Sequence, residues 1–182
     1  MVIFGVFIVL SIQIPTLAVA DATAQSIDNL SDTGMNNTTT IDPSSEIAAM
    51  TAAFGEPFYE LKDTIDTGNE VVDLEPQQTK DSYVGQGYMK GIGNITEYGT
   101  YTTTYSSPIV SSIGKGIIFD NDKVVATYTA QDTGRYDNEG NLFSKGTMFF
   151  QSDDASINEK VGLYLYWQDN NGTDWSRTWS WE

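Results

Sequence analysis

The stretch VVATYTAQDTGRYDNEGNLFSKGTMFFQ, residues 124–151, decides the fold class of this chain. Apolar and polar residues alternate in its first half, which is the period of a strand with one buried face. Residues 137–141 then supply the Asp, Asn and Gly that tolerate the left-handed conformations of tight turns. Residues 142–151 form a second extended run. The stretch therefore predicts two antiparallel strands joined by a hairpin turn.

The same pattern continues on both sides of this hairpin. From residue 54 onward, period-two alternation dominates and no segment sustains a helical period. Further strands are predicted at 58–64, 69–74, 82–92, 96–105, 112–119, 161–168 and 175–181. Short links between so many strands indicate an all-β fold, a small antiparallel barrel of about eight strands, because closing the barrel removes exposed sheet edges. A two-sheet β-sandwich is the alternative.

Glycines inside the predicted strands favour the barrel over the sandwich. A strand glycine marks sharp coiling or a place where another part of the chain comes close. The positions concerned are Gly85, Gly87, Gly91, Gly93, Gly114, Gly116 and Gly146.

The N-terminal residues indicate export. Residues 1–20 carry no charge, and Ala18-Val19-Ala20 before Asp21 is the small-x-small pattern of a signal-peptidase site. The alternative is an uncleaved N-terminal anchor, which would be the protein's one attachment to a membrane. Either way we expect an extracytoplasmic protein, secreted or tethered to the cell surface.

Residues 21–53 predict a flexible acidic spacer before a barrel domain at 54–182. The segment is rich in Ser, Thr and Asn and has no aromatic residue, so it offers little apolar area to offset the entropy of ordering it. Its deletion is therefore expected to leave the melting temperature of the domain unchanged. A short helix at 45–53, begun by Ser44 and Ser45, is the alternative.

Composition excludes several classes of function. The chain of 182 residues has 25 acidic and 9 basic side chains, a net charge of −16, and neither Cys nor His. Nucleic-acid binding needs a basic face, so it is not expected. Thiol, imidazole and Ser-His-Asp chemistry are impossible without those residues. The acidic turns lack the spacing of a calcium-binding loop, and we expect no metal and no cofactor.

The stretch GKGIIFDNDKVVATYTAQDTGRYDNEGNLFSKGTMFF, residues 114–150, resembles uncharacterised secreted prokaryotic proteins related to the allene oxide cyclase-like and dirigent-like β-barrels. Gly99-Thr100-Tyr101 and the ending at 179–182 match further elements of that pattern. The resemblance covers residues 54–182 and implies an eight-stranded barrel. It implies no particular activity, since no catalytic residue of the cyclases aligns with a position in this chain.

Four residues are candidates for ligand binding inside such a barrel. Glu97 and Tyr101 share one face of a predicted strand, Arg135 lies near the end of another, and Lys145 shares a face with Phe143. A few placed polar groups of this kind would orient a small ligand. The alternative is that these side chains point outward into solvent, as polar residues on strands often do.

Two classes of function follow. The favoured one is a non-catalytic module that binds a small apolar or amphipathic molecule or a cell-surface partner, as a monomer or an oligomer. The alternative is a cofactor-independent isomerase or cyclase-like enzyme acting in the cavity. A cavity lined by tyrosine with an inward carboxylate would favour the enzyme, and an interior filled by Trp, Phe and Leu would favour a structural or protein-binding role.

Two further features carry predictions. Five sequons are candidate glycosylation sites: Asn29, Asn36, Asn37, Asn94 and Asn171. The tryptophan face of the last strand is expected to be buried, so Trp179→Ala should cost about 3–5 kcal/mol. Thr178→Ala, on the opposite face, should cost less than about 1 kcal/mol.

Overall fold

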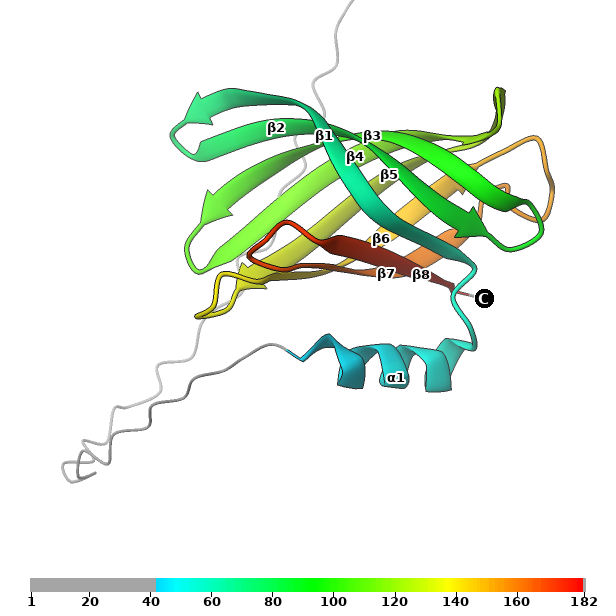
Figure 1. Ribbon diagram of the computed structural model, residues 1–182, viewed down its shortest axis with the longest axis horizontal. Helices are drawn as coiled ribbons and strands as arrows, with labels where there is room; N and C mark the ends of the chain where they lie inside the picture. Colours follow the sequence, from blue (N-terminus) through cyan, green and yellow to red (C-terminus); the bar gives the residue numbers. More distant parts are fainter. Residues whose placement is uncertain (1–41, 182) are drawn as a thin grey trace, which may run out of the picture. The chain divides into compact units, whose positions relative to one another are not determined.

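A computed structural model describes residues 42–181, which form one helix and a closed antiparallel barrel of eight strands (Figure 1). The elements are α1 (Pro43–Phe54), β1 (Tyr59–Leu74), β2 (Gln77–Met89), β3 (Gly93–Ser106), β4 (Ile109–Asp120), β5 (Lys123–Tyr136), β6 (Leu142–Gln151), β7 (Val161–Gln168) and β8 (Asp174–Ser180). Each strand pairs with the next along the chain, and β8 closes on β1. The predicted all-β barrel is confirmed, and the sandwich is not formed.

Strand β1 differs from the prediction. Residues 58–64 and 69–74 are not two strands but parts of one, whose register with β2 shifts three times. One shift lies between Lys62 and Ile65, where Asp63 takes a left-handed φ of 53°. An irregularity of this kind bends a strand without ending it, which the alternation pattern could not distinguish from a break.

The seam between β1 and β8 is short. The ladder between them covers only Tyr59–Lys62 against Trp175–Thr178, and β1 then continues as a long hairpin with β2. Beyond the ladder, the Asp174 side chain accepts hydrogen bonds from the backbone N–H of Thr64, at 3.2 Å, and from the Thr64 hydroxyl. A side chain thus replaces ladder hydrogen bonds where the two strands diverge.

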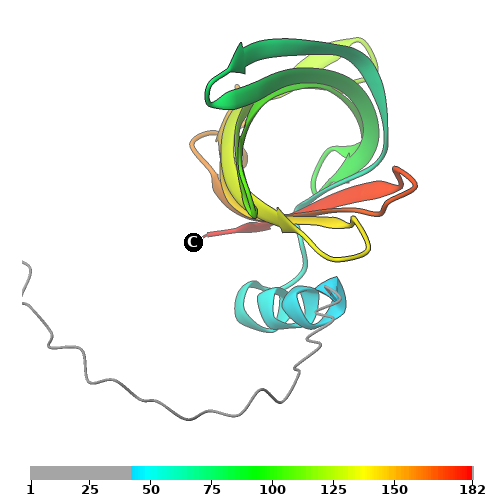
Figure 2. The ribbon, with the colours of Figure 1, turned by 90° about the vertical axis from the view of Figure 1, so that its left-hand side faces the viewer.

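One end of the barrel is filled by apolar side chains. This end holds the beginning of β1 and the end of β2, and Phe58, Met89, Ile118, Phe150 and Ile157 pack there with less than a tenth of their surface exposed. The Phe58 and Phe150 rings meet edge to face, with centroids 5.3 Å apart. Side chains therefore close this end, and the open ring of ribbons in Figure 2 is hollow only in part.

Helix α1 corrects the predicted spacer. Pro43 occupies the first turn, and the Asp42 carboxylate accepts a hydrogen bond from the Ser44 N–H at 2.9 Å, which is a helix N-cap. The spacer prediction is therefore wrong for residues 43–53, and the alternative of a helix at 45–53 is confirmed. Residues 21–41 lie outside the described part of the chain, as does the candidate signal peptide.

The tryptophan face of β8 lies outside the barrel, beneath α1. Trp179 is fully buried with Phe143 and Leu165, and Ile47 and Met50 of α1 pack against this cluster. The predicted burial of this face is confirmed for Trp179, whereas Trp175 is partly buried and Trp181 is 60% exposed. The opposite face is not exposed, however, because it is the inner wall of the barrel.

Thr178 shows this most clearly. Its side chain is as completely buried as that of Trp179, and its hydroxyl donates to the Met148 sulfur at 3.5 Å. The expectation that Thr178→Ala would be nearly neutral therefore rests on a wrong assignment of faces.

No helix within residues 42–181 has the length and apolar character needed to cross a membrane.

Candidate functional site

The half of the barrel that the apolar plug leaves open contains a cavity of about 280 Å³. Its lining is aromatic and acidic, and none of the described residues that form it is Lys or Arg. Five carboxylate residues face it: Asp66, Asp81, Glu97, Asp132 and Asp174. Eight of the chain's ten tyrosines also line it: Tyr59, Tyr83, Tyr101, Tyr105, Tyr128, Tyr136, Tyr164 and Tyr166.

Glycines on neighbouring strands make room for three of these tyrosines. Register places Tyr83 opposite Gly99, Tyr128 opposite Gly116 and Tyr164 opposite Gly146. A Cβ atom added at Gly116 would lie 2.5 Å from the Tyr128 ring, and one added at Gly146 would lie 2.7 Å from the Tyr164 ring. Each ring therefore extends sideways over the neighbouring strand, so that it covers the wall of the barrel instead of crossing the interior.

The predicted role of Gly116 and Gly146 as points of close approach is confirmed, and Gly87 behaves in the same way against the Glu60 backbone. Gly91 and Gly93 instead take left-handed φ values at the β2–β3 turn.

Glu97 lies where the apolar plug meets the cavity. Its side chain is 1% exposed, and its Oε1 accepts hydrogen bonds from the hydroxyls of Tyr83 and Tyr128, the latter at 2.5 Å. The two hydroxyls are themselves 2.9 Å apart. Burial raises the pKa of Glu97 to about 8, against the opposing effect of the Tyr128 hydrogen bond. The carboxyl group is therefore mostly protonated at neutral pH.

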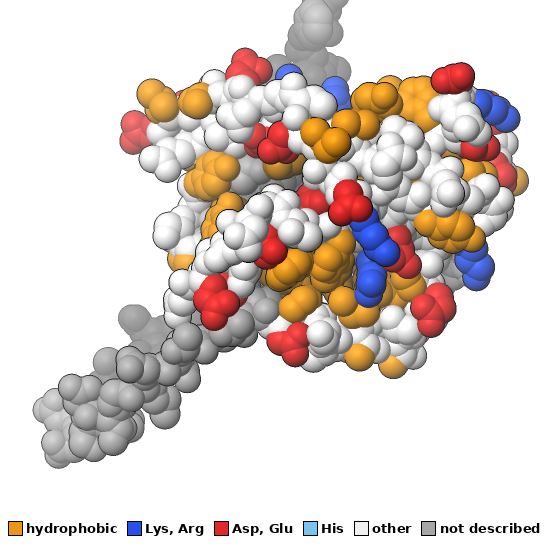
Figure 3. Space-filling view, viewed as in Figure 1, with side chains coloured by type: hydrophobic (Ala, Val, Ile, Leu, Met, Phe, Trp, Pro, Cys, Tyr) orange, Lys and Arg blue, Asp and Glu red, His pale blue; other side chains and the backbone are white. Residues whose placement is uncertain are grey.

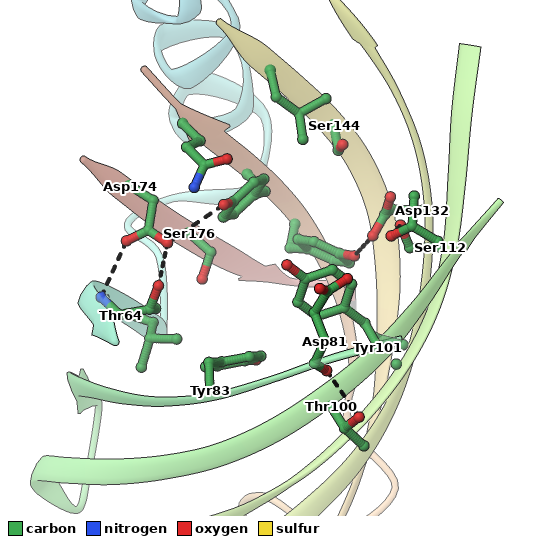
Figure 4. A pocket seen from close by; sticks show the side chains of 18 of the residues that line it. Thr64, Asp81, Tyr83, Thr100, Tyr101, Ser112, Asp132, Ser144, Asp174 and Ser176 are labelled. Carbon is green, nitrogen blue, oxygen red and sulfur yellow. Dashed lines mark hydrogen bonds between the residues drawn. The ribbon is translucent and has the colours of Figure 1, made fainter. Parts of the chain in front are cut away.

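Two other inward carboxylates are also held by hydroxyl groups. Asp132 accepts a hydrogen bond from the Tyr164 hydroxyl, and burial raises its pKa. Asp174 is bound to Thr64 and lies 3.4 Å from the donating Tyr166 hydroxyl (Figure 4). These carboxylates come from β5 and β8, so acidic groups face the cavity from different parts of the wall.

The cavity reaches the solvent. Tyr136, at the end of β5, lines it and is 48% exposed, and Asp66, in the part of β1 that has left β8, is also exposed. Both lie away from the plugged end, at the mouth of the cavity. A small molecule could therefore enter without the barrel opening.

The structure brings together two of the four predicted ligand residues. Glu97 and Tyr101 both line the cavity. Arg135 and Lys145 are exposed on the outer face, where Lys145 pairs with Glu46 of α1 at 2.7 Å. The expectation that these two basic residues point into the barrel is wrong, because each sits one position out of phase with its inward neighbour, Gly134 or Ser144.

Of the candidate glycosylation sites, Asn94 and Asn171 are exposed. Asn29, Asn36 and Asn37 lie outside the described residues.

Sequence reasoning missed much of the site. The sequence does not identify Tyr83, Tyr128 or Asp174. Asp174 shares a face of β8 with Ser176, and Tyr83 and Tyr128 are placed on the inner face only by their pairing with Gly99 and Gly116 on neighbouring strands. For Asp174 the misleading signal was the apolar character of the opposite face of β8, where Trp179 packs with residues of α1 and not in the barrel interior.

The arrangement suits binding by hydrogen bonds, charge and aromatic contact. Within residues 42–181, no three acidic side chains come together as a group that could hold a metal ion. Tyrosine hydroxyls can donate and accept, ionised carboxylates only accept, and the ring faces attract apolar or cationic groups. A protonated Glu97 would in addition be able to donate a proton.

Comparison of the chain with models of known families, with curated proteins and with solved structures gives no match.

Proposed function

We propose that this protein binds a small organic molecule inside its barrel, as an extracytoplasmic module. The observation that carries the proposal is a solvent-connected cavity of about 280 Å³ whose buried polar atoms are not all satisfied. Glu97 Oε2 and the Tyr59 hydroxyl are buried and have no hydrogen-bond partner in the described structure. Buried polar groups are normally paired, so these atoms support an occupant with polar groups of its own.

The polar lining refines the ligand class expected from the sequence. A purely apolar ligand would leave Glu97 Oε2 and the Tyr59 hydroxyl unpaired, at a cost of about 1–3 kcal/mol for each group. The apolar surface that a ligand would meet is mostly aromatic ring. An amphipathic ligand is therefore favoured over a fatty or hydrocarbon one.

A cavity-blocking variant tests the proposal. Ala130 lines the cavity on β5, and its neighbour Thr129 is exposed on the outer face. We expect that Ala130→Phe abolishes the binding of small molecules found by screening amines, polyols and carboxylic acids with ligand-observed NMR. Thr129→Phe, which adds the same group outside, should retain it. Binding that survives Ala130→Phe in a folded protein would contradict the proposal.

Proton-transfer catalysis is the second candidate, and one observation favours it. A tyrosine-lined cavity with an inward carboxylate is the arrangement that favours an isomerase or cyclase-like enzyme, and Glu97 combines burial with a pKa near neutrality. If the protein is such an enzyme, a ligand that binds the cavity should be converted by the wild-type protein and not by Glu97→Gln. Unchanged ligand with both proteins, followed by NMR over days, would leave binding as the function.

A further inference from the structure

Acidic side chains line the cavity of this protein, and basic side chains do not. Five carboxylate residues line the cavity, whereas none of the chain's nine basic residues is among the described lining residues. Single strands show this separation of basic from cavity-lining side chains. Arg135, Lys145 and Arg177 point outward from β5, β6 and β8, whereas Asp132, Ser144 and Asp174 of the same three strands line the cavity. A negatively charged ligand would lie among these acidic side chains without a single cationic partner in the described lining.

Charge outside the barrel also favours cations. The net charge of −16 gives the whole molecule a negative field, and acidic side chains are spread over the face drawn in Figure 3. A cleft lined by one sign of charge concentrates ions of the opposite sign. The net charge and the acidic lining of the cavity therefore both favour cations over anions.

The aromatic lining decides what kind of cation fits. Tyr83, Tyr128 and Tyr164 line the cavity and extend over the glycines of the neighbouring strands. Ring faces attract cations whose charge is spread over alkyl groups, and partial desolvation strengthens the attraction. A bare metal ion would instead need several carboxylate oxygens in one place, and the described residues form no such group.

Buried polar atoms supply an observation independent of this charge. Glu97 is 1% exposed, lines the cavity and has an Oε2 atom without a hydrogen-bond partner among the described residues. The Tyr59 hydroxyl, on a side chain equally buried, is in the same state. Both residues lie toward the plugged end of the lining, whereas Asp66, Asp81 and Asp174 lie nearer the mouth.

We propose that the cavity binds a small organic ammonium ion, held between the inward carboxylates and the faces of the tyrosine rings. The inference rests on the proposed function, since it names the ligand class of the same cavity. The shape of the site favours an ammonium group with a short polar extension, because ring faces and carboxylates form the walls while a carboxyl and a hydroxyl group lie toward the plugged end.

Choline and its neutral isostere 3,3-dimethyl-1-butanol test the proposal, since they differ in charge and not in shape. Isothermal titration calorimetry of the full chain should give an affinity for choline at least about tenfold higher than for the alcohol, as expected when a cation gains ring-face and carboxylate contacts. Asp174→Asn should weaken choline binding severalfold and leave binding of the alcohol unchanged. Asp122→Asn, which removes the same charge from the exposed β4–β5 turn, should change neither.

Asp174 also holds Thr64, so Asp81→Asn provides a second cavity variant that does not touch this contact. Equal affinity for choline and the alcohol would overturn the cation proposal and leave ligand binding intact. Binding of a neutral sugar or an organic acid in the cavity, with no binding of choline, would also overturn the cation proposal and leave ligand binding intact. Failure of all these compounds to bind would overturn both the cation proposal and the proposed function.

Discussion

At the scale of single residues, the cavity depends on carboxyl groups that the barrel keeps out of water. Glu97 is the extreme case, with burial opposing its ionised form and two tyrosine hydroxyls bound to one of its oxygens. Such a group links the stability of the fold to pH. Its pKa is about 8 in the folded chain, against a value of 4.5 without the barrel around it.

Glu97 should make the protein less stable as pH rises. Between pH 4.5 and 8 the folded chain retains a proton that the unfolded chain has lost, so the free energy of unfolding falls with pH in this window by up to about 1.4 kcal/mol per unit. Glu97→Gln removes this dependence because the amide does not titrate. We therefore predict that the stability of the wild type relative to Glu97→Gln decreases from pH 5 to pH 8 in urea denaturation. A difference that stays constant across this range would show that Glu97 is ionised in the fold.

Gly146 should tolerate no side chain. A Cβ atom there would clash with the carbonyl oxygen of Gln131 and come within 2.7 Å of Tyr164 and of Asp132. We predict that Gly146→Ala costs about 1–3 kcal/mol, as overpacking does. Gly68 is the matched control, because nothing lies within 4 Å of a Cβ added there, and Gly68→Ala should stay within about 0.5 kcal/mol. Both values come from chemical denaturation, and equal costs would contradict this packing.

At the scale of elements, α1 and β8 form an apolar layer outside the barrel. Ile47 and Met50 lie over the Trp179 cluster, and the Arg177 guanidinium lies 5.3 Å from the centre of the Trp175 ring while its Nε is 3.5 Å from Glu60. The helix therefore gives a structural explanation for the burial of Trp179. Trp179 is not needed to fill the barrel, which leaves the interior free for the cavity.

The helix should contribute to stability. Replacing both Ile47 and Met50 by Ser is expected to lower the free energy of unfolding by about 2–4 kcal/mol, through lost apolar contact with the cluster. Ala48→Ser with Ala49→Ser, at exposed positions of the same helix, loses at least as much helix propensity and should still cost less, because no apolar contact with the cluster is lost. Thermal melts of the two double variants provide the comparison. Similar melting temperatures would restore the view of residues 43–53 as a spacer.

Substitutions on either face of β8 should destabilise the protein. Trp179→Ala is expected to cost about 3–5 kcal/mol and Thr178→Ala about 1–2 kcal/mol, since both side chains are fully buried, one under α1 and one inside the barrel. The ratio of the two costs, from urea denaturation, distinguishes this account from one with an exposed inner face. A neutral Thr178→Ala would contradict the inward position of that side chain.

Strand alternation explains what could be predicted from the sequence and what could not. The limits of β6 and β7 follow from the period of two and from turns rich in Asp, Asn and Gly. The period of two also places Glu97 and Tyr101 on the same face of β3. Parity alone does not say which face of a strand is inside. For this reason the sequence predicts Arg135 and Lys145 as cavity residues, although both are exposed on the outer face. For the same reason it does not predict Asp174, which lies on the face of β8 opposite the apolar one.

At the scale of the whole molecule, export remains a prediction that concerns the N-terminus. Residues 1–20 are uncharged and end in Ala18-Val19-Ala20, so the mature protein should begin at Asp21. Mass spectrometry of the protein isolated from its natural source tests this directly. Recovery of a chain that retains residues 1–20 in the membrane fraction would indicate an anchored protein instead.

The barrel as a whole is plugged by apolar side chains at one end and contains, at the other, a cavity that we propose binds cations. NMR titration of choline into protein with labelled methyl groups tests this claim most directly. The methyl groups of Ala130 and Met148, which line the cavity, should shift in a saturable way, while those of Ala52 on α1 and Val124 on the outer face stay in place. Shifts at the outer methyl groups, or none at Ala130 and Met148, would contradict it.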